Sequence, residues 1–367
     1  MNRKLNICVI FGGQSPEHEV SVMSAASIID AIDRKKYSVE TIWIDRDGHW
    51  FKGIRPAQLP DKKKTAPPIS DIITELGRYE VVFPALHGHF GEDGAIQGIF
   101  EMAQIPYVGA DVLSAALVMD KAMTKTICAA CGIPVVEGIE IDFGRWSRHV
   151  AEVEKKIISK IGFPCFVKSS TGGSSIGTSK VSSPSELGQA IELAFLYSRR
   201  ILIEKAVDAR EIECGLLGNN DPAASICGEI RTINEFYDYE AKYCSDKTEL
   251  IIPADIPQGV SEQIQSMALE AFRALRCRGM ARADFFLDKT TGRLYLNELN
   301  TIPGFTAMSM YPLLWQAGGL SYSKLLDRLI CLGLEAGQKI QKPHKNRSNK
   351  LSNNRIPATL SLDDNIS

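Results

Sequence analysis

Carboxylate, amide and guanidinium side chains gather in "ARADFFLDKTTGRLYLNELNTIPGFT", residues 281–306. The turn-forming "DKTTG" separates two strand-like runs, which predicts a β-hairpin. Because alternate strand residues face the same way, Arg282 shares a face with Asp284, and Glu298 shares one with Asn300. Antiparallel pairing would bring these four side chains together, and their hard oxygens suit Mg²⁺. The alternative is a salt bridge on a solvated sheet face. The apolar residues expected on the core face are Phe285, Leu294 and Leu296.

A glycine- and serine-rich loop in "FPCFVKSSTGGSSIGTSK" could bind phosphate. Its backbone N–H groups can form a concavity for phosphate oxygens, and Lys168, at the end of the preceding strand, adds a positive charge. The loop is not a Walker A motif, because Thr178 follows Gly177 where lysine is required. It is not a dinucleotide fingerprint either, because Ser174 replaces the second glycine. We therefore predict a movable flap over phosphates, with a plain hairpin loop as the alternative.

Three further segments carry polar residues at expected loop positions. In "FGGQSPEHEVS" a strand gives way to a helix, where ligands bind in open α/β sheets, so Glu17 either holds a cationic group or complements the helix dipole. His87 in "ALHGHFGEDG" is a ligand contact or a hydrogen-bonded structural histidine. Lys242 and Tyr243 in "FYDYEAKYCSD" belong to a lid over a pocket or to an amphipathic strand edge.

The elements that must position these residues alternate between strand-like and helical runs. "NICVIFGG", "EVSVMSAASIIDAID", "SVETIWI" and "YEVVFPALHG" follow a β-α-β order, which predicts a parallel sheet with helices on its faces. The segment "IPYVGADVLSAALVMDKAMTKTICAACGIPVV" then holds a long helical pattern, which Gly132 and Pro134 stop. From about Asp208 strands predominate, interrupted by the helical "VSEQIQSMALEAFRALRC" and followed by a helix over about 321–334. The predicted fold class is α/β, with α+β character in the second half.

Composition limits the function classes. A chain of 367 residues is comfortable for two or three domains, and 44% apolar with 23% charged residues is ordinary for a soluble globular protein. The net charge of −2 gives no general attraction to nucleic acid. No apolar run approaches the roughly 18 residues needed to span a bilayer, and no signal-peptide cleavage site follows the N-terminus. We expect no nucleic-acid partner and no membrane segment.

Nine scattered cysteines indicate a reducing cytoplasm rather than a disulfide scaffold. Cys128 and Cys131 form a lone C-x-x-C in a helical context, which we interpret as buried small residues and not as a zinc site. The final residues are polar, rich in Asn and Ser, and nearly without apolar periodicity, so we predict a disordered, solvated tail.

Taken in order, several segments resemble the ATP-grasp ligases, most closely the D-alanine–D-alanine ligase family. They are "FGGQSPEHEVS", "ALHGHFGEDGAIQGIFE", "IPYVGADVLSAALVMDK", "FVKSSTGGSSIGTSKV", "ILIEKAV", "EFYDYEAKY", "ARADFFLD" and "LNELNTIPGFTAMSMYP". The resemblance spans about residues 5–335 and implies an ATP-grasp fold preceded by an open parallel-sheet domain. The implied units are an N-terminal domain at 1–109, ATP-grasp subdomains at 110–207 and 208–336, and a tail at 337–367.

The resemblance also implies an ATP site with two Mg²⁺ ions, or Mn²⁺ in their place. Lys121 and Lys168 would bind phosphates, the segment 204–207 would contact adenine, and Glu211 would bind the ribose. The implied metal ligands are Asp284, Glu298 and Asn300. The full set implied for ATP is Lys121, Lys168, Ser174, Ser175, Glu204, Lys205, Ala206, Val207, Glu211 and Lys242.

Two D-alanine sites follow from the same resemblance. Glu17 would bind the ammonium of the first D-alanine, with His87 nearby. Ser309 and Lys242 would bind the carboxylate of the second, beside Met310. The residues implied in catalysis are Glu17, Ser174 and Tyr243, which lock the lid, Arg282 and the Gly304 N–H, which stabilise the oxyanion, and Ser309. A homodimer is the assembly expected from the family.

The chain departs from the family pattern only in the flap, and other functions stay open. "VKSS" replaces the more frequent "VKPS", and Thr171 with Gly172 replaces a bulkier pair, so the flap is expected to be looser. A D-alanine–D-serine ligase is the nearest alternative. D-lactate is disfavoured because the loop lysine and tyrosine are present. A dinucleotide-dependent oxidoreductase and a non-catalytic nucleotide-binding regulator are the alternatives from other classes.

Overall fold

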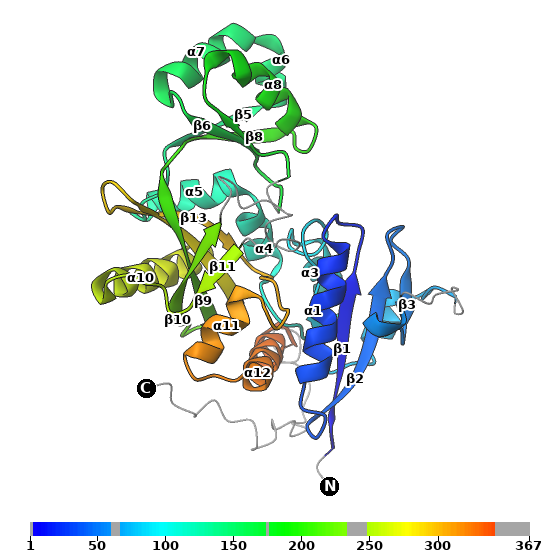
Figure 1. The fold of residues 1–367 in the computed structure, drawn as a ribbon. Helices are drawn as coiled ribbons and strands as arrows, with labels where there is room; N and C mark the ends of the chain where they lie inside the picture. Colours follow the sequence, from blue (N-terminus) through cyan, green and yellow to red (C-terminus); the bar gives the residue numbers. More distant parts are fainter. Residues whose placement is uncertain (1–2, 60–66, 174–175, 233–247, 342–367) are drawn as a thin grey trace.

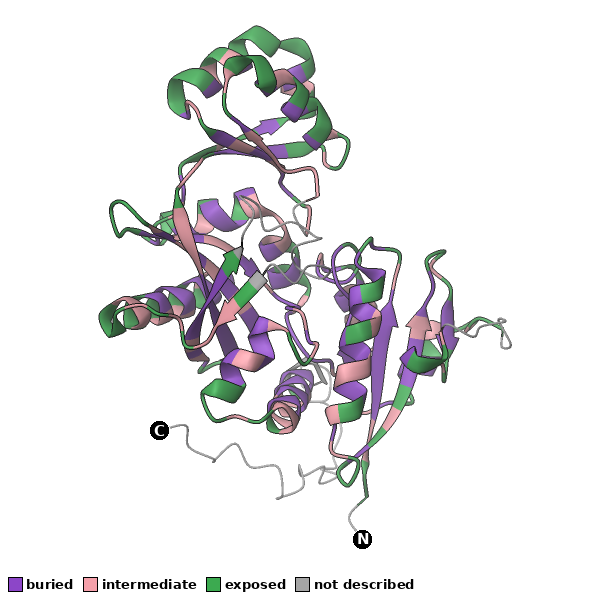
Figure 2. Cartoon of the chain, viewed as in Figure 1, coloured by how far each residue is buried: buried purple, intermediate pink, exposed green. Residues whose placement is uncertain are grey.

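The computed structural model describes residues 3–59, 67–173, 176–232 and 248–341. Within these ranges the chain forms three separate sheets, each covered by helices (Figure 1). Buried residues follow the strands and the inner sides of the helices, as Figure 2 shows. No helix in the described part of the chain is both long enough and apolar enough to cross a membrane.

The N-terminal sheet has the order β3-β2-β1-β4. Its strands are β1 (Leu5–Gly12), β2 (Tyr37–Ile44), β3 (Trp50–Lys52) and β4 (Val81–Pro84). β1 pairs in parallel with β2 and β4, which confirms the predicted parallel sheet, whereas the short edge strand β3 is antiparallel and was not predicted. The accompanying helices are α1 (His18–Ala31), η1 (Pro56–Gln58), α2 (Ile72–Leu76) and α3 (Ala95–Met102).

The middle sheet is antiparallel throughout and has the order β5-β8-β6-β7. Its strands are β5 (Gly138–Asp142), β6 (Cys165–Ser169), β7 (Ser179–Val181) and β8 (Arg200–Lys205). Its helices are α6 (Phe143–Arg148), α7 (Val150–Lys160) and α8 (Pro184–Phe195). The glycine- and serine-rich loop joins β6 to β7, so the flap leaves the sheet from the strand that carries Lys168.

The third sheet is also antiparallel, with the order β11-β10-β9-β12-β13. Its strands are β9 (Ala209–Gly218), β10 (Ala223–Thr232), β11 (Thr248–Ile251), β12 (Gly279–Asp288) and β13 (Leu294–Asn300). Its helices are α10 (Gln258–Ala274), α11 (Met310–Ala317) and α12 (Tyr322–Gln341). α12 contacts α1 and β4 on one side and β9 and β12 on the other, and so connects the N-terminal sheet to the third sheet.

The predicted hairpin is confirmed. β12 pairs with β13 in a register that sets Arg282 opposite Asn300 and Asp284 opposite Glu298. The expected core-facing side chains, Phe285, Leu294 and Leu296, are buried in one apolar cluster with α10. A β-bulge after Asp284 shifts the register beyond the polar positions, so both polar pairs stay on one face.

Three sequence predictions need correction. The long helical pattern is two helices, α4 (Val112–Met119) and α5 (Lys121–Ala130), because Asp120 leaves the helical conformation and its carboxylate caps α5. Cys128 is buried, as predicted, but Cys131 is exposed. α12 continues to Gln341, beyond the predicted end, so 337–341 are helical and not tail. The rest of the predicted tail lies outside the described residues, and the domain boundaries stay predictions.

Replacing Gly279 by alanine is expected to lower the free energy of unfolding by about 2 kcal/mol or more. Gly279 has φ +74°, and a Cβ there would lie 2.9 Å from the Cα of Gly109, where β12 meets the end of the N-terminal domain. Urea unfolding measures the change. Gly292→Ala is the matched control, because Gly292 has φ +67° and no atom of the described residues within 4 Å of its added Cβ. Equal losses in both variants would show that the close approach contributes nothing.

Candidate active site

Two cavities meet beside the β12–β13 hairpin. The larger, of about 1190 Å³, lies between the middle and third sheets, and the second, of about 1100 Å³, reaches the N-terminal domain. Five residues line both cavities, so ligands bound in the two cavities would come together beside them. The shared residues are Lys121, Gly172, Glu213, Arg282 and Glu298.

Arg282 lies at this meeting point, held by two carboxylates. Its Nε and Nη2 donate to the two carboxylate oxygens of Asp284, each at 2.7 Å. Glu213 Oε2 lies 2.9 Å from Nε, because the register of β9 and β12 sets Glu213 opposite Asp284. The arginine is thereby fixed in direction before any ligand arrives. Glu213 escaped the sequence analysis, although it lies two residues from Glu211 on the same strand face.

Lys121, the first residue of α5, joins the hairpin to the flap. Its Nζ lies 3.0 Å from Glu298 Oε2 and donates to the carbonyl oxygen of Gly172 at 2.9 Å. Burial acts to lower the pKa of Lys121, but the neighbouring carboxylate of Glu298 outweighs it and the pKa is raised. Lys121 is therefore a firmly charged ammonium between the two cavities.

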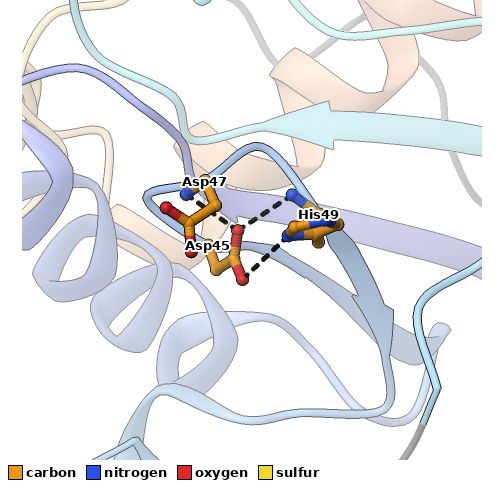
Figure 3. Close-up of side chains that lie close together, drawn as sticks. All are labelled: Asp45, Asp47 and His49. Atoms are coloured by element: carbon orange, nitrogen blue, oxygen red, sulfur yellow. Dashed lines mark hydrogen bonds and ion pairs between the residues drawn. The ribbon is translucent and has the colours of Figure 1, made fainter.

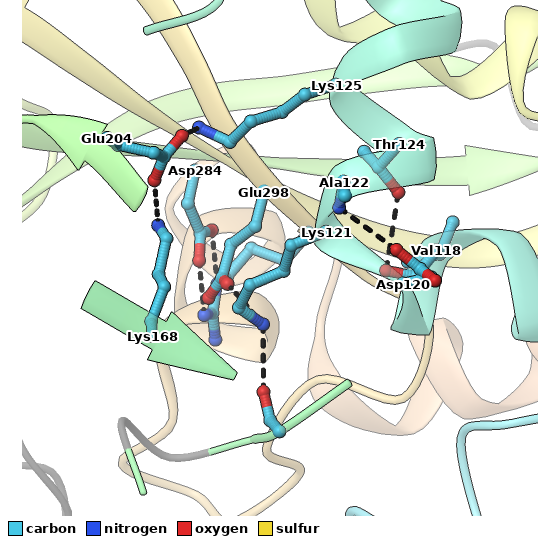
Figure 4. Close-up of polar contacts among 12 residues, drawn as sticks. Val118, Asp120, Lys121, Ala122, Thr124, Lys125, Lys168, Glu204, Asp284 and Glu298 are labelled. Atoms are coloured by element: carbon cyan, nitrogen blue, oxygen red, sulfur yellow. Dashed lines mark hydrogen bonds and ion pairs between the residues drawn. The ribbon is translucent and has the colours of Figure 1, made fainter. Parts of the chain in front are cut away.

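Glu204 forms ion pairs with Lys125 and Lys168, as Figure 4 shows. The three charged side chains come from β8, α5 and β6. Burial acts to raise the pKa of Glu204, but the two lysines outweigh it and hold the pKa below its ordinary value. Both lysines thus engage the Glu204 carboxylate, so only the backbone groups of Glu204 are left to contact a ligand. The sequence analysis did not single out Lys125. Its position four residues after Lys121, on the same helix face, was the signal that could have identified it.

The second cavity contains Glu17 and His87, both buried. Glu17 immediately precedes α1, as predicted. The two ring nitrogens of His87 are both engaged, Nε2 with Ser24 Oγ at 2.9 Å and Nδ1 with the Ile302 carbonyl at 3.0 Å. Burial lowers the pKa of His87, so the ring is neutral, with Nδ1–H donating to the carbonyl. His87 is therefore a hydrogen-bonded structural histidine that also lines the cavity.

Glu92 is a buried carboxyl group that the sequence analysis did not single out. Its Oε2 accepts a hydrogen bond from the Gly88 N–H at 2.6 Å. A Cβ at Gly88 would lie 2.5 Å from Glu17 Oε2, so both carboxyl groups lie beside this glycine. Burial, reinforced by the charge of Glu17, raises the pKa of Glu92 to about 8. Glu92 is consequently protonated at neutral pH.

Glu92→Gln is expected to stabilise the protein at alkaline pH and to have little effect at acid pH. The folded-state pKa of about 8 lies above the ordinary 4.5, so the unfolded chain releases this proton first. Stability from the protonated group is complete below 4.5 and is lost as pH rises through about 8. The expected gain of the variant is about 2–4 kcal/mol near pH 9. Thermal melts across this range measure it, and a pH-independent difference would contradict the assignment.

The loop after β13 borders the second cavity. Ser309 precedes α11, and its Oγ accepts from the Thr306 N–H at 3.0 Å. A Cβ at Gly304 would lie 2.9 Å from that Oγ, so the glycine allows the loop to fold tightly there. Met310 is buried in the same lining. The backbone of Gly304 and the hydroxyl group of Ser309 therefore line the same cavity as Arg282.

The other predicted site residues fall into three groups. Those that line the larger cavity include Lys168, Glu204, Lys205, Ala206, Val207, Glu211 and Asp284. Asn300 lines the second cavity, and its Oδ1 accepts from the Ile302 N–H at 3.2 Å. Four predicted residues lie outside the described part of the chain: Ser174, Ser175, Lys242 and Tyr243.

A separate acidic group lies at the turn between β2 and β3 (Figure 3). Asp45 Oδ1 accepts from the backbone N–H groups of Asp47 and His49, each at 2.9 Å, and Oδ2 lies 3.4 Å from His49 Nδ1. These contacts stabilise the turn and account for the arrangement without a ligand.

Comparison with known families decides the identity of this fold. The model of the D-Ala–D-Ala ligase N-terminus matches residues 6–110, and that of the C-terminus matches 127–331. The chain belongs to the D-alanine–D-alanine ligase family. The D-alanine–D-alanine ligase of Thermoanaerobacter pseudethanolicus is 48% identical over 91% of this chain and 97% of its own length. The D-alanine–D-alanine ligase of Heliobacterium modesticaldum is 44% identical over 90% of this chain and 95% of its own length.

Two solved structures of ligases that use D-alanine have the same fold. The D-alanine–D-alanine ligase from Coxiella burnetii has a TM-score of 0.82, 38% identity, and coverage of 93% of this chain and 97% of that one. The VanG D-Ala:D-Ser ligase from Enterococcus faecalis has a TM-score of 0.82 and 34% identity, covering 90% of this chain and all of the other. The predicted ATP-grasp fold is confirmed, and membership removes the support for an oxidoreductase.

Proposed function

We propose that this protein joins two D-alanine molecules into D-alanyl-D-alanine, with conversion of ATP to ADP and phosphate. The observation that carries the proposal is the meeting of two cavities at Lys121, Arg282 and Glu298. A nucleotide in one cavity and amino acids in the other would react at this point. Family membership and the relatives of 44–48% identity support the choice of substrates.

The chemistry explains why both cavities are needed. A carboxylate is a poor acyl donor, so the first D-alanine attacks the γ-phosphate and becomes an acyl phosphate. Lys121 and Lys168 would offset the charge of the transferring phosphoryl group. The amine of the second D-alanine then attacks the acyl carbon and forms a tetrahedral oxyanion, which Arg282 and the Gly304 N–H would stabilise. A flap closing over the site would protect the acyl phosphate from water.

The substrates are assigned to residues by charge. The ammonium of the first D-alanine would pair with Glu17, near the neutral His87. The carboxylate of the second would bind Ser309 and Lys242, beside Met310. A Cβ at Gly173 would lie 3.0 Å from Glu17 Oε2, which supports a flap that closes on Glu17. Ser174 and Tyr243 would complete that closure, with Ser175 near the phosphates.

For ATP, the larger cavity offers a matching set of groups. Glu204 and Lys205 at the end of β8, with Ala206 and Val207 after it, would contact adenine through backbone groups, and Glu211 would bind the ribose. Lys242, which lies outside the described residues, would also bind the phosphates. The phosphate end of the nucleotide would then lie toward Lys121, where the second cavity begins.

Divalent metal fits the donor set of the hairpin. Asp284 and Glu298 provide carboxylates and Asn300 an amide oxygen, the hard ligands that Mg²⁺ prefers. In this structure the Asp284 carboxylate is paired with Arg282 and the Glu298 carboxylate with Lys121. Cationic side chains therefore already lie where the carboxylates favour positive charge. We propose that two Mg²⁺ ions, or Mn²⁺ in their place, bind here with ATP and supply charge neutralisation for phosphoryl transfer.

D-serine is the second candidate for the acceptor. The VanG D-Ala:D-Ser ligase, at 34% identity, has that specificity, and an apolar pocket rejects an added hydroxyl by only about 100-fold. The lining of the second cavity near Ser309 includes Leu250, Ile252 and Leu313, which favours the methyl group of alanine.

The cellular setting follows from the reaction. D-alanyl-D-alanine is a peptidoglycan precursor, so we propose a role in cell wall synthesis and cell shape. The ATP requirement and the scattered free cysteines support a cytoplasmic location. A homodimer is proposed from family membership.

The decisive experiment supplies the purified protein with ATP, MgCl₂ and D-alanine, D-serine with D-alanine, D-lactate with D-alanine, or L-alanine. Phosphate release and dipeptide are measured together. We expect phosphate and D-alanyl-D-alanine in equal amounts, with L-alanine inactive. Preferential formation of D-alanyl-D-serine would favour the second candidate, and no ADP with any pair would overturn the proposal.

A further inference from the structure

Lys125 has no role in the reaction described above, yet it is buried within the ATP cavity wall. Its side chain is 7% exposed and forms an ion pair with the Glu204 carboxylate, which is 4% exposed. Lys168 forms an ion pair with the other carboxylate oxygen. Among the residues that the structure describes, the lining of the larger cavity includes Lys168 and Glu204 but not Lys125. The carboxylate therefore lies between Lys168, which lines the larger cavity, and Lys125, which does not (Figure 4).

The two lysines differ in what a bound nucleotide would require of them. Lys168 must leave, or at least share, its contact with Glu204 when it binds a phosphate. Without a second cation, that movement would leave a buried carboxylate uncompensated, which is strongly unfavourable. Glu204 would then retain Lys168 and compete with the phosphate. Lys125, at the opposite oxygen, stays in place and keeps the carboxylate paired.

The neighbouring charges leave Lys125 as the suitable counter-ion. Lys121 lies on the same helix face but is engaged with Glu298 and the Gly172 carbonyl. Lys205, the next residue along β8, is paired with Glu137 on the exposed side. Two positive charges around one carboxylate also leave a net positive charge in the wall, which favours an approaching polyphosphate.

We propose that Lys125 is a positioning residue for ATP: it neutralises Glu204 so that Lys168 is released to the nucleotide phosphates. The inference rests on the proposed function only in taking ATP as the ligand of the larger cavity. It concerns nucleotide affinity and not the peptide-forming step.

The test measures the Kd for ATP with MgCl₂ by isothermal titration calorimetry, on four variants of the full chain and the wild type. Lys125→Met removes the charge and keeps the length of the side chain. The double variant Lys125→Met, Glu204→Gln removes the carboxylate as well. Lys125→Arg keeps the charge. Lys155→Met, an exposed lysine on α7, is the matched control. Circular dichroism verifies that each variant is folded.

Lys125→Met is expected to raise the Kd about tenfold or more, because Glu204 then retains Lys168. The double variant is expected to return to within about threefold of the wild type, since no carboxylate remains to hold Lys168. Lys125→Arg and Lys155→Met are expected to stay close to the wild type. The KM for D-alanine is a second readout. At saturating ATP it should be the same in Lys125→Met as in the wild type, because the change affects only the binding of ATP.

Two results would overturn the inference. One is an unchanged Kd in Lys125→Met; the other is a double variant that binds ATP as weakly as the single one, which would make Lys125 a structural support. If Lys125→Met does not fold, the Kd of the double variant for ATP decides. The inference requires a value within about threefold of the wild type, and a much higher Kd would overturn it. Failure of the proposed function is distinguishable: the wild type would then bind ATP but release no phosphate with D-alanine.

Discussion

Replacing Arg282 by methionine is expected to lower kcat about 100- to 1000-fold, the usual cost of losing one good oxyanion donor. Arg282 is held by Asp284 and Glu213 at the junction of the two cavities, so its guanidinium is oriented before the reaction begins. Such preorganised charge stabilises the tetrahedral intermediate without rearrangement. Steady-state rates of phosphate release with D-alanine, fitted for kcat and KM, measure the loss.

Arg293→Met provides the matched control for this prediction. Arg293 lies on the same hairpin, is exposed, and packs over Tyr295 away from the cavities. Its removal should leave kcat unchanged. Arg282→Lys keeps the charge but loses the planar fork that pairs with carboxylates, so a substantial loss is expected there as well. A kcat near wild type in Arg282→Met would exclude the oxyanion role.

Replacing Glu298 by glutamine is expected to lower activity about 100-fold or more and to raise the Mg²⁺ concentration needed for half-maximal rate. The amide keeps an oxygen but loses the charge that a divalent cation requires. Lys121 loses its partner at 3.0 Å in the same change. Titration with MgCl₂ and with MnCl₂ at saturating ATP measures the shift in metal dependence separately from the loss of rate.

The control here is Glu262→Gln on the exposed side of α10, where the Gln258 side-chain amide donates to the Glu262 carboxylate at 2.9 Å. It should leave both the rate and the metal dependence unchanged. If Glu298→Gln lowers the rate but keeps the Mg²⁺ dependence of the wild type, Glu298 acts through Lys121 and is not a metal ligand.

Local patterns in the sequence were sufficient for the hairpin. The alternation of polar and apolar residues and the "DKTTG" turn correctly predicted which side chains of β12 and β13 face the core, because this periodicity depends only on the strand conformation. The same reasoning predicted the parallel N-terminal sheet and the position of Glu17 at the start of α1. Motif order over most of the chain gave the family.

Local patterns were misleading where a single residue decides between two conformations. The apolar periodicity from Val112 to Ala130 continues through Asp120, so it predicted one helix. The carboxylate of Asp120 instead accepts from the N–H groups of Ala122 and Met123, each at 3.0 Å, and starts a new helix. This break aims Lys121 at Glu298 and Gly172.

The sequence by itself determined the parallel pairing of the N-terminal sheet, the polar face of the hairpin and the family, because each depends on residues close together in the chain or on motif order. Only the tertiary structure decided the charge partners: Lys125 and Lys168 on Glu204, Glu213 on Arg282, and Glu92 beside Glu17. These groups come from different helices and strands. Their pairing depends on how the elements pack and on the burial that packing imposes, and neither is encoded in the spacing of residues along one element.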